Sequence, residues 1–252
     1  MQCHTTNIIN LFTIKYHGNW LFTMLRFLLI FIVLSLLSCS DIGQKKKISE
    51  GEIEYQIEYL DNERDNPFIM LLPRKMITSF NENSSHTLIE GFFGTFKLSY
   101  ILNSLQEKNF TLLQIMDKKY IYQADINNLA FGYQNMRNIK IQYTNKEKTI
   151  AGYKCKHAIA NFQDGQNDSI NLYYTDEINL QKPNLNNPFR EIDGVLMEFT
   201  VKLVGINMKF LTNKVRQKET NPRLFEIPNG YTRITLHEME KLVEDFNLSS
   251  GK

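Results

Sequence analysis

The pair of side chains best suited to catalysis is Cys155 and His157, which lie in Thr149–Phe162, a segment whose pattern predicts a β-strand. Residues i and i+2 of a strand project to the same face, so a nucleophile and a base, or two metal ligands, could meet there. The sequence offers no readable third partner, and a lone cysteine on an apolar strand face is usually a small core residue. We therefore expect both side chains to lie in the core.

A second motif, His237-Glu238, begins like the zinc-binding helix of metalloproteases. Lys241 stands where that helix needs its second histidine, so the paired ligands are missing. The sequence also contains no Gly-x-Ser-x-Gly elbow, phosphate-binding loop or dinucleotide fingerprint. These absences predict a protein that is not an enzyme and that uses no metal and no cofactor.

The charge balance bears on nucleic acids as partners. The 252 residues include 29 Lys and Arg against 27 Asp and Glu. Two of the basic residues, Lys15 and Arg26, lie in residues 1–38, which contain no acidic residue, so the rest of the chain is formally neutral. Because a neutral chain lacks the positive surface that phosphate backbones require, we expect no nucleic-acid partner.

The amino-terminal region carries an apolar run, Phe27–Leu37, directly after the basic Met24–Arg26. As a helix the run would span about 16 Å, roughly half the hydrocarbon thickness of a bilayer. That length is typical of the apolar core of a secretory signal. The run ends at Leu36–Cys39, which resembles the lipobox of bacterial lipoproteins. The resemblance implies cleavage before Cys39 and its acylation, for example with palmitate.

These features divide the amino-terminal region. Residues 1–38 are the expected signal peptide, in which 1–23 would be an over-called start and Met24 the initiator, and 39–49 would be the lipidated cysteine and a flexible tether. An uncleaved, tilted membrane anchor and cleavage by the ordinary signal peptidase stay open as alternatives. Ser40, rather than the Asp associated with inner-membrane retention, follows Cys39. This analogy favours an outer-membrane address, with the protein lipid-anchored in the cell envelope.

The mature chain is predicted to be mainly β. In Gly51–Tyr59, apolar and polar residues alternate over nine positions, as expected for a strand with one buried face. Similar segments follow, separated by polar stretches such as Asn145–Lys148, without interleaved amphipathic helices. This arrangement favours a single large curved antiparallel sheet, a half-barrel, over a parallel sheet. The further strand segments are Lys75–Asn81, His86–Phe92, Thr95–Leu102, Phe110–Met116, Lys119–Gln123, Arg137–Thr144, Thr149–Phe162, Ser169–Thr175, Gly194–Val204 and Asn207–Arg216.

Two helices are plausible. Ala124–Met136 is ambiguous, because Gly132 and several Asn residues lower its helix propensity. The second helix would begin after Thr235, with Glu238 completing a capping box and an apolar face turned to the sheet. We expect this carboxy-terminal helix to cover the sheet of one domain, residues 50–247, followed by a short tail, 248–252.

Aromatic residues are abundant, with 12 Tyr and 17 Phe. Many lie on the predicted strands, where a curved sheet with a covering helix can enclose an apolar cavity. An ordinary sheet core is the alternative interpretation. The candidate cavity residues are Tyr55, Tyr59, Phe96, Tyr100, Tyr153, Tyr173 and Phe199.

Four stretches, Gly51–Tyr59, Leu72–Met76, Ile150–Lys156 and Phe225–Tyr231, together resemble a family of exported bacterial lipoproteins of unknown function. The domain of that family is similar to the outer-membrane lipoprotein carrier (LolA-like) fold. The resemblance implies a half-barrel that holds acyl chains or other apolar ligands between its sheet and covering helices. It assigns no ligand-contacting residue in this sequence.

Two functions follow from these observations. The first is a lipid-anchored envelope protein that binds an apolar ligand, either a lipid or an acylated protein, in an aromatic-lined cavity. The second is a non-catalytic scaffold or assembly lipoprotein that binds an unidentified protein partner. A deep Tyr- and Phe-lined cavity would favour the first function, and a solid core with a long bare sheet edge would favour the second.

Overall fold

The structure is a computed structural model that describes residues 47–61, 72–91, 94, 96–163, 169–203 and 205–250, without the side chains of 246–250. The chain divides into two compact units, Met1–Lys46 and Lys47–Lys252, and only the second is described. The predicted signal peptide, Cys39 and most of the tether therefore lie outside the described residues. In the described part, no helix has both the length and the apolar character needed to cross a bilayer.

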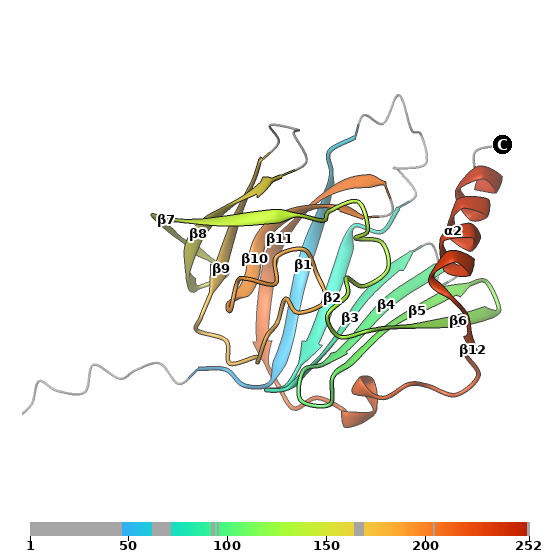
Figure 1. The fold of residues 1–252 in the computed structure, drawn as a ribbon. Helices are drawn as coiled ribbons and strands as arrows, with labels where there is room; N and C mark the ends of the chain where they lie inside the picture. Colours follow the sequence, from blue (N-terminus) through green and yellow to red (C-terminus); the bar gives the residue numbers. More distant parts are fainter. Residues whose placement is uncertain are drawn as a thin grey trace, which may run out of the picture. The chain divides into compact units, whose positions relative to one another are not determined.

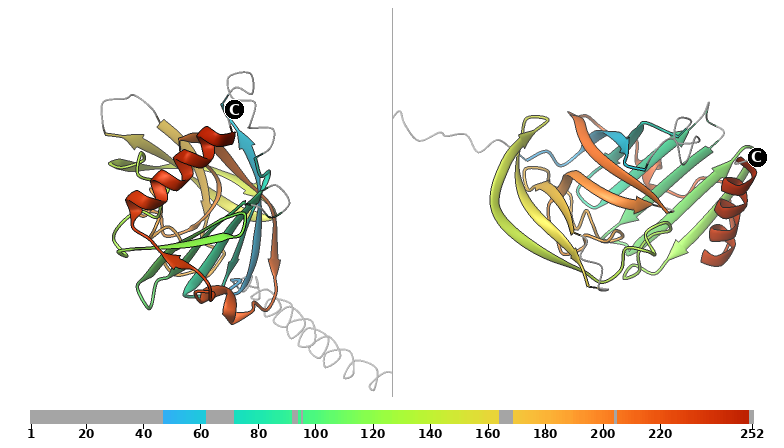
Figure 2. Two further views of the ribbon diagram at one scale, coloured as in Figure 1. Left: turned by 90° about the vertical axis from the view of Figure 1, so that its right-hand side faces the viewer. Right: turned by 90° about the horizontal axis from the view of Figure 1, so that it is seen from above.

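A twelve-stranded sheet forms the described domain (Figure 1). Its spatial order is β12-β6-β5-β4-β3-β2-β1-β11-β10-β9-β8-β7, and every neighbouring pair is antiparallel except β12 with β6. The sheet curls without closing, and α2 (Leu236–Ser250) lies beside β6 at the end opposite β7 (Figure 2). The predicted fold class, a curved antiparallel half-barrel with a carboxy-terminal helix, is confirmed. The strands are β1 (Gly51–Tyr59), β2 (Lys75–Phe80), β3 (Ser84–Gly91), β4 (Phe96–Asn103), β5 (Lys108–Ile115), β6 (Lys118–Ala124), β7 (Ile139–Ile150), β8 (Tyr153–Phe162), β9 (Ser169–Thr175), β10 (Val195–Leu203), β11 (Ile206–Gln217) and β12 (Thr232–Arg233).

The apolar residues gather in two clusters on opposite faces of the curled sheet. The larger cluster fills the concave side, where the rings of Phe199 and Phe210 stack with centroids 5.1 Å apart. The smaller cluster contains Ile101 and Phe110, and Tyr231 from the segment between β11 and α2 packs against it. The convex side of β4–β6 is thus covered by the chain on its way to the helix.

The capping box that begins α2 is confirmed. The Thr235 backbone N–H donates to Glu238 Oε2 at 2.7 Å, and the Glu238 N–H donates back to Thr235 Oγ1 at 3.2 Å. The Thr235 backbone N–H and hydroxyl, which both donate to the Glu238 carboxylate, lower the pKa of that carboxyl below its ordinary value. Met239 and Val243 on the inner face of the helix are buried, so capping and burial act together to fix α2.

The prediction of a helix at Ala124–Met136 is wrong, because this stretch forms a series of turns. Asp125 Oδ1 accepts the backbone N–H of Asn127 at 2.8 Å, a local bond that competes with helix formation. Gly132 has a φ of 95°, outside the range of a right-handed helix. Ala130 and Phe131 are buried instead in the concave cluster, so tertiary packing outweighs helix propensity here.

The predicted break at Asn145–Lys148 is also wrong, since β7 runs through it. A register shift between Tyr143 and Glu147 absorbs the polar residues as a bulge. The chain reverses later, at Ala151 and Gly152, with φ of 49° and 86°. Two central residues with positive φ are the mark of a type I′ hairpin turn, which suits the twist of the flanking strands.

The turn generates a stability prediction. Ala151 tolerates a positive φ poorly, whereas Asn adopts it readily and is common before Gly in such turns. We expect Ala151→Asn to raise the free energy of unfolding by roughly 0.5–1 kcal/mol, measured by urea denaturation. Ala151→Val should lower it, because a β-branched residue is disfavoured at positive φ. Equal stabilities of the three proteins would contradict the assigned turn.

Candidate functional site

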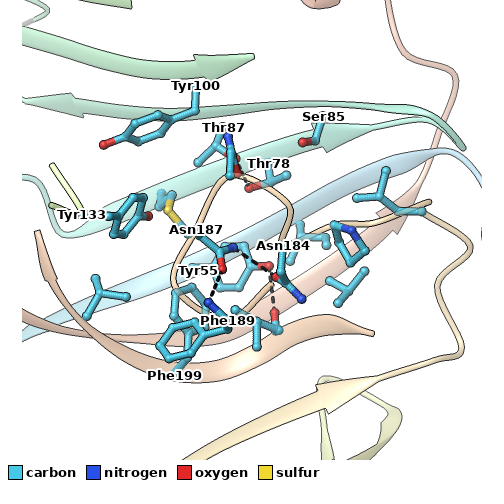
Figure 3. Close-up of a pocket in the computed structure, with 18 residues that line it drawn as sticks. Tyr55, Thr78, Ser85, Thr87, Tyr100, Tyr133, Asn184, Asn187, Phe189 and Phe199 are labelled. Carbon is cyan, nitrogen blue, oxygen red and sulfur yellow. Dashed lines mark hydrogen bonds between the residues drawn. The ribbon is translucent and has the colours of Figure 1, made fainter. Parts of the chain in front are cut away.

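The concave side of the half-barrel is occupied by the chain itself. Between the ends of β9 and β10 lie residues 176–194, here called the β9–β10 segment, which contains no regular helix or strand. Phe189 and Ile192 of this segment are fully buried, and the Phe189 ring packs edge-on to Phe199 with centroids 6.3 Å apart. Figure 3 shows Asn184, Asn187 and Phe189 of this segment next to Tyr55 of the sheet. The segment therefore lies against the concave face of the sheet.

The first part of the β9–β10 segment is fixed by backbone hydrogen bonds. Ile48 forms a parallel bridge with Ile178, and the Asn179 N–H donates to the Ile48 carbonyl at 2.7 Å. The Gln181 N–H donates to the Glu82 carbonyl at 2.7 Å. Ile48, just before β1, and Glu82, in the turn between β2 and β3, thus hold the start of this segment in place.

The remainder of the segment is held largely by asparagine side chains, together with a backbone bond from the Ala130 N–H to the Asn186 carbonyl at 2.8 Å. Asn184, which is 3% exposed, donates from Nδ2 to the carbonyls of Ile192 and Gly194 at 2.7 and 2.9 Å. Its Oδ1 accepts from Asn187 Nδ2 at 3.1 Å, and Asn187 Oδ1 accepts the Phe189 N–H at 2.9 Å. These bonds close a loop whose inner side presents Phe189 to the sheet. Side-chain amides suit this role because each supplies both donors and an acceptor.

A glycine is required where the segment rejoins the sheet. A Cβ on Gly194 would lie 2.7 Å from the Thr175 carbonyl oxygen and 2.5 Å from a ring carbon of Tyr174. Real side chains do not approach backbone so closely, so any larger residue would displace the end of the segment.

A small pocket of about 80 Å³ remains between the segment and the sheet (Figure 3). Its walls include Tyr55, Tyr100 and Phe199 from the strands. Tyr133 from the turns between β6 and β7 and Phe189 from the β9–β10 segment complete them. An apolar cavity of about 150 Å³ holds a molecule the size of benzene. In this arrangement the pocket is therefore too small for an acyl chain.

The polar groups around the pocket are already satisfied. The Tyr55 hydroxyl donates to the Leu196 carbonyl and the Tyr100 hydroxyl to the Phe131 carbonyl, each at 3.0 Å. Burial raises the pKa of both tyrosines well above the ordinary value. Throughout the described residues, no buried side-chain nitrogen or oxygen lacks a hydrogen-bond partner. The tyrosine hydroxyls thus fix the sheet and its covering segments.

The seven aromatic candidates from the sequence fall into two groups. Tyr55, Tyr100 and Phe199 line the pocket, and the other four do not. Tyr59 donates from its hydroxyl to the Pro73 carbonyl at 2.6 Å, and Phe96 is half-buried at the start of β4. Tyr153 is buried, and Tyr173 packs beside His157.

Sequence reasoning missed Tyr133, Phe189 and the asparagines of the β9–β10 segment. Tyr133 lies in the stretch mistaken for a helix, and the others lie in a segment without periodicity. The signal that could have found them is the density of asparagine and proline in residues 183–188, which marks a structured loop.

Cys155 and His157 lie in the core, as predicted. Burial raises the pKa of the Cys155 thiol to about 11, and its Sγ contacts the Tyr153 carbonyl at 3.4 Å. The two ring nitrogens of His157 lie 2.7 Å from Thr144 Oγ1 and 3.0 Å from Asn171 Oδ1. A protonated thiol and a histidine with both nitrogens engaged are poorly suited to nucleophilic catalysis. Within the described ranges, no cluster of three or more His, Cys, Asp or Glu could hold a metal ion.

Comparison with known proteins adds information on the fold alone. No family model and no curated protein matches the chain. A structure of PNGF-II is similar with a TM-score of 0.50 and 13% identity, covering 78% of this chain and 33% of that chain. An uncharacterized conserved protein from Thermus thermophilus has a TM-score of 0.41 and 8% identity, with coverages of 80% and 99%. A putative outer membrane lipoprotein-sorting protein domain from Vibrio parahaemolyticus has a TM-score of 0.19 and 8% identity, with coverages of 70% and 88%.

The chain spans about a third of the length of PNGF-II. The class of protein that the structure defines is an antiparallel half-barrel whose concave face is covered by its own chain. This fold class is the one that the sequence resemblance implies.

The asparagine network generates a second prediction. Asn184→Ala removes the donors to two buried carbonyls, and leaving such groups unpaired costs about 1–3 kcal/mol. We expect urea denaturation to show a loss of that size for Asn184→Ala. Gln181→Ala, an exposed side chain in the same segment, should change stability by no more than about 0.5 kcal/mol. A loss for Asn184→Ala no larger than that of the control would show that the network does not hold the segment.

Proposed function

We propose that the protein is a lipid-anchored, non-catalytic lipoprotein of the cell envelope that binds an apolar ligand, a lipid or an acyl group, on the concave face of its half-barrel. The observation that carries the proposal is that the β9–β10 segment, a loop, covers that face. The aromatic rings of Tyr55, Tyr100 and Phe199 are covered by a loop, rather than by a regular helix or strand. Long loops without secondary structure are commonly functional lids.

The way the cover is held supports its movement. Its start is tied by backbone bonds to Ile48 and Glu82. Residues 182–194 have one backbone bond to the neighbouring turn, from the Ala130 N–H to the Asn186 carbonyl, and are otherwise held by side chains such as Asn184 and by the burial of Phe189 and Ile192. A ligand that took the place of these two side chains would restore the apolar contacts that the sheet loses. Opening would also enlarge the pocket beyond its resting volume of about 80 Å³.

The protein is proposed to be anchored in the outer membrane through acylated Cys39. The support is the sequence alone, namely the apolar run Phe27–Leu37 and the lipobox-like Leu36–Cys39. Several acyl chains would hold a protein on a bilayer far more firmly than one myristoyl chain, which binds marginally.

The anchor can be tested by metabolic labelling with a palmitate analogue. The full chain produced in a bacterial envelope should incorporate the label and fractionate with outer membranes. Cys39→Ser should lose all incorporation, whereas Cys155→Ser should retain it, because Cys155 is buried in the folded domain. Equal labelling of the wild-type chain and Cys39→Ser would overturn the assignment.

Ligand binding can be tested by comparing native and denatured mass spectra of the full chain purified from a bacterial envelope. Acyl groups on Cys39 add mass in both spectra, whereas a bound ligand adds mass only in the native one. We expect an extra native mass that extracts into organic solvent. Val201→Phe, which adds bulk in the pocket wall, should abolish it, and Thr200→Phe, on the opposite face of β10, should not.

Two results would contradict the proposal. One is a clean native mass that stays unchanged after incubation with bacterial lipid extract. The other is a bound mass that both phenylalanine variants retain equally, although far-UV circular dichroism shows both to be folded.

One observation favours the scaffold function as a second candidate. At the end of the sheet, β7 pairs with β8 alone among the described strands, which leaves one long edge without a neighbour. An exposed edge can accept a strand from a partner protein. Lys140 and Lys146 and the bulge after Tyr143 are features that also protect edges from such pairing. The apolar-ligand function therefore remains the first candidate.

A further inference from the structure

A second, larger pocket lies where the turns after β6, the β9–β10 segment and the start of α2 meet. This groove has a volume of about 440 Å³, within the range of roughly 300–1,000 Å³ found for small-molecule sites. Its walls come from the turns at 127–139, from residues 188–191 of the β9–β10 segment, from Tyr122 of β6 and from Leu236 at the start of α2. It shares no lining residue with the inner pocket.

The polar wall of the groove is dominated by carboxamides, which both donate and accept hydrogen bonds. Gln134 is held in place, because its Oε1 accepts the Gly132 N–H at 2.7 Å and its Nε2 donates to the Ala130 carbonyl at 3.2 Å. Asn127 and Asn128 are exposed, and their side chains have no hydrogen-bond partner among the described residues. Their donors and acceptors are therefore free to meet a ligand.

The charges of the groove nearly balance. Arg190 is engaged by the protein, since its two terminal nitrogens donate to the carbonyls of Asn127 and Leu185, each at 2.7 Å. Arg137 and Glu191 have opposite charges, and neither forms an ion pair with a described residue. Glu240 lies close enough to contribute to the raised pKa of Tyr122, after burial as the larger cause. A groove without a clear excess of one sign does not select a strongly charged ligand.

The groove also has apolar lining residues. They are Met136 and Pro188, which are buried, and Leu236 and Tyr122, which are half-buried. A ligand that suits this mixed lining presents an apolar surface together with groups that both donate and accept hydrogen bonds. A sugar ring has this character, because its C–H groups form an apolar face and its hydroxyls both donate and accept.

We propose that the groove formed by Tyr122, Asn127, Asn128 and Arg137 is a binding site for a neutral carbohydrate. The ring would lie against Tyr122 and Leu236, and adjacent hydroxyls would bond to the amides of Asn127 and Asn128. Arg137 would donate to a further hydroxyl. This site is separate from the apolar pocket, so either can be present without the other.

The test uses the full chain in a zwitterionic detergent, because alkyl glycoside detergents would compete for the site. Four disaccharides, cellobiose, maltose, chitobiose and mannobiose, are titrated by saturation-transfer NMR and calorimetry. At least one should bind with a dissociation constant of about 1 mM or below. The double variant Asn127→Ala/Asn128→Ala should weaken that binding at least about tenfold, the equivalent of ~1.4 kcal/mol.

The control is Asn145→Ala, an exposed asparagine on β7 outside the groove, which should bind as the wild type does. The native mass of any apolar ligand should be the same in all three proteins, which separates this site from the inner pocket. Absence of binding by all four disaccharides, or binding that the double variant retains in full, would overturn the proposal.

Discussion

The concave face of a curled sheet must be covered, and this requirement shapes the rest of the molecule. The stacked rings of Phe199 and Phe210 would face water if the sheet stood alone. Full burial of one such side chain is worth roughly 1.5–3 kcal/mol, a large share of a net stability of about 5–15 kcal/mol. Phe189 and Ile192 supply the cover from within the chain.

The interactions that hold the β9–β10 segment on the concave face are weak enough for an apolar ligand to replace them. Each hydrogen bond made by Asn184 contributes only about 1 kcal/mol net, since water can replace a protein partner once the segment opens. The larger contribution comes from the burial of Phe189 and Ile192, and an acyl chain would supply contacts of the same kind. Moving the β9–β10 segment off the sheet therefore costs much more free energy without a ligand than with one. Arg190, which joins the β9–β10 segment to the turn at Asn127, also lines the second pocket.

Much of the fold could be predicted because strand periodicity is a local property. The alternation in Gly51–Tyr59 gives the bounds of β1, and the capping box gives the start of α2. The predictions that were wrong involve contacts distant in sequence. Ala130 and Phe131 are drawn into the core by partners that no local pattern reveals, and β7 continues through polar residues because a bulge accommodates them.

The candidate site was harder to predict for the same reason. Tyr55, Tyr100 and Phe199 share the pocket, but Tyr153 and Tyr173 have the same residue type and lie elsewhere. Alternation shows that a side chain is buried without showing which of several apolar clusters it joins. The cover itself has no periodicity, and its role follows only from the contacts of Asn184 and Phe189.

The central claim is that residues 182–194 leave the concave face when an apolar ligand binds. Hydrogen–deuterium exchange of the full chain with and without palmitate tests it most directly. We expect faster exchange in residues 182–194 on addition of palmitate, while exchange in residues 176–181 and in strands β1, β10 and β11 becomes slower or stays unchanged. Unchanged or slower exchange in residues 182–194 with palmitate bound would show that the segment is a fixed part of the core.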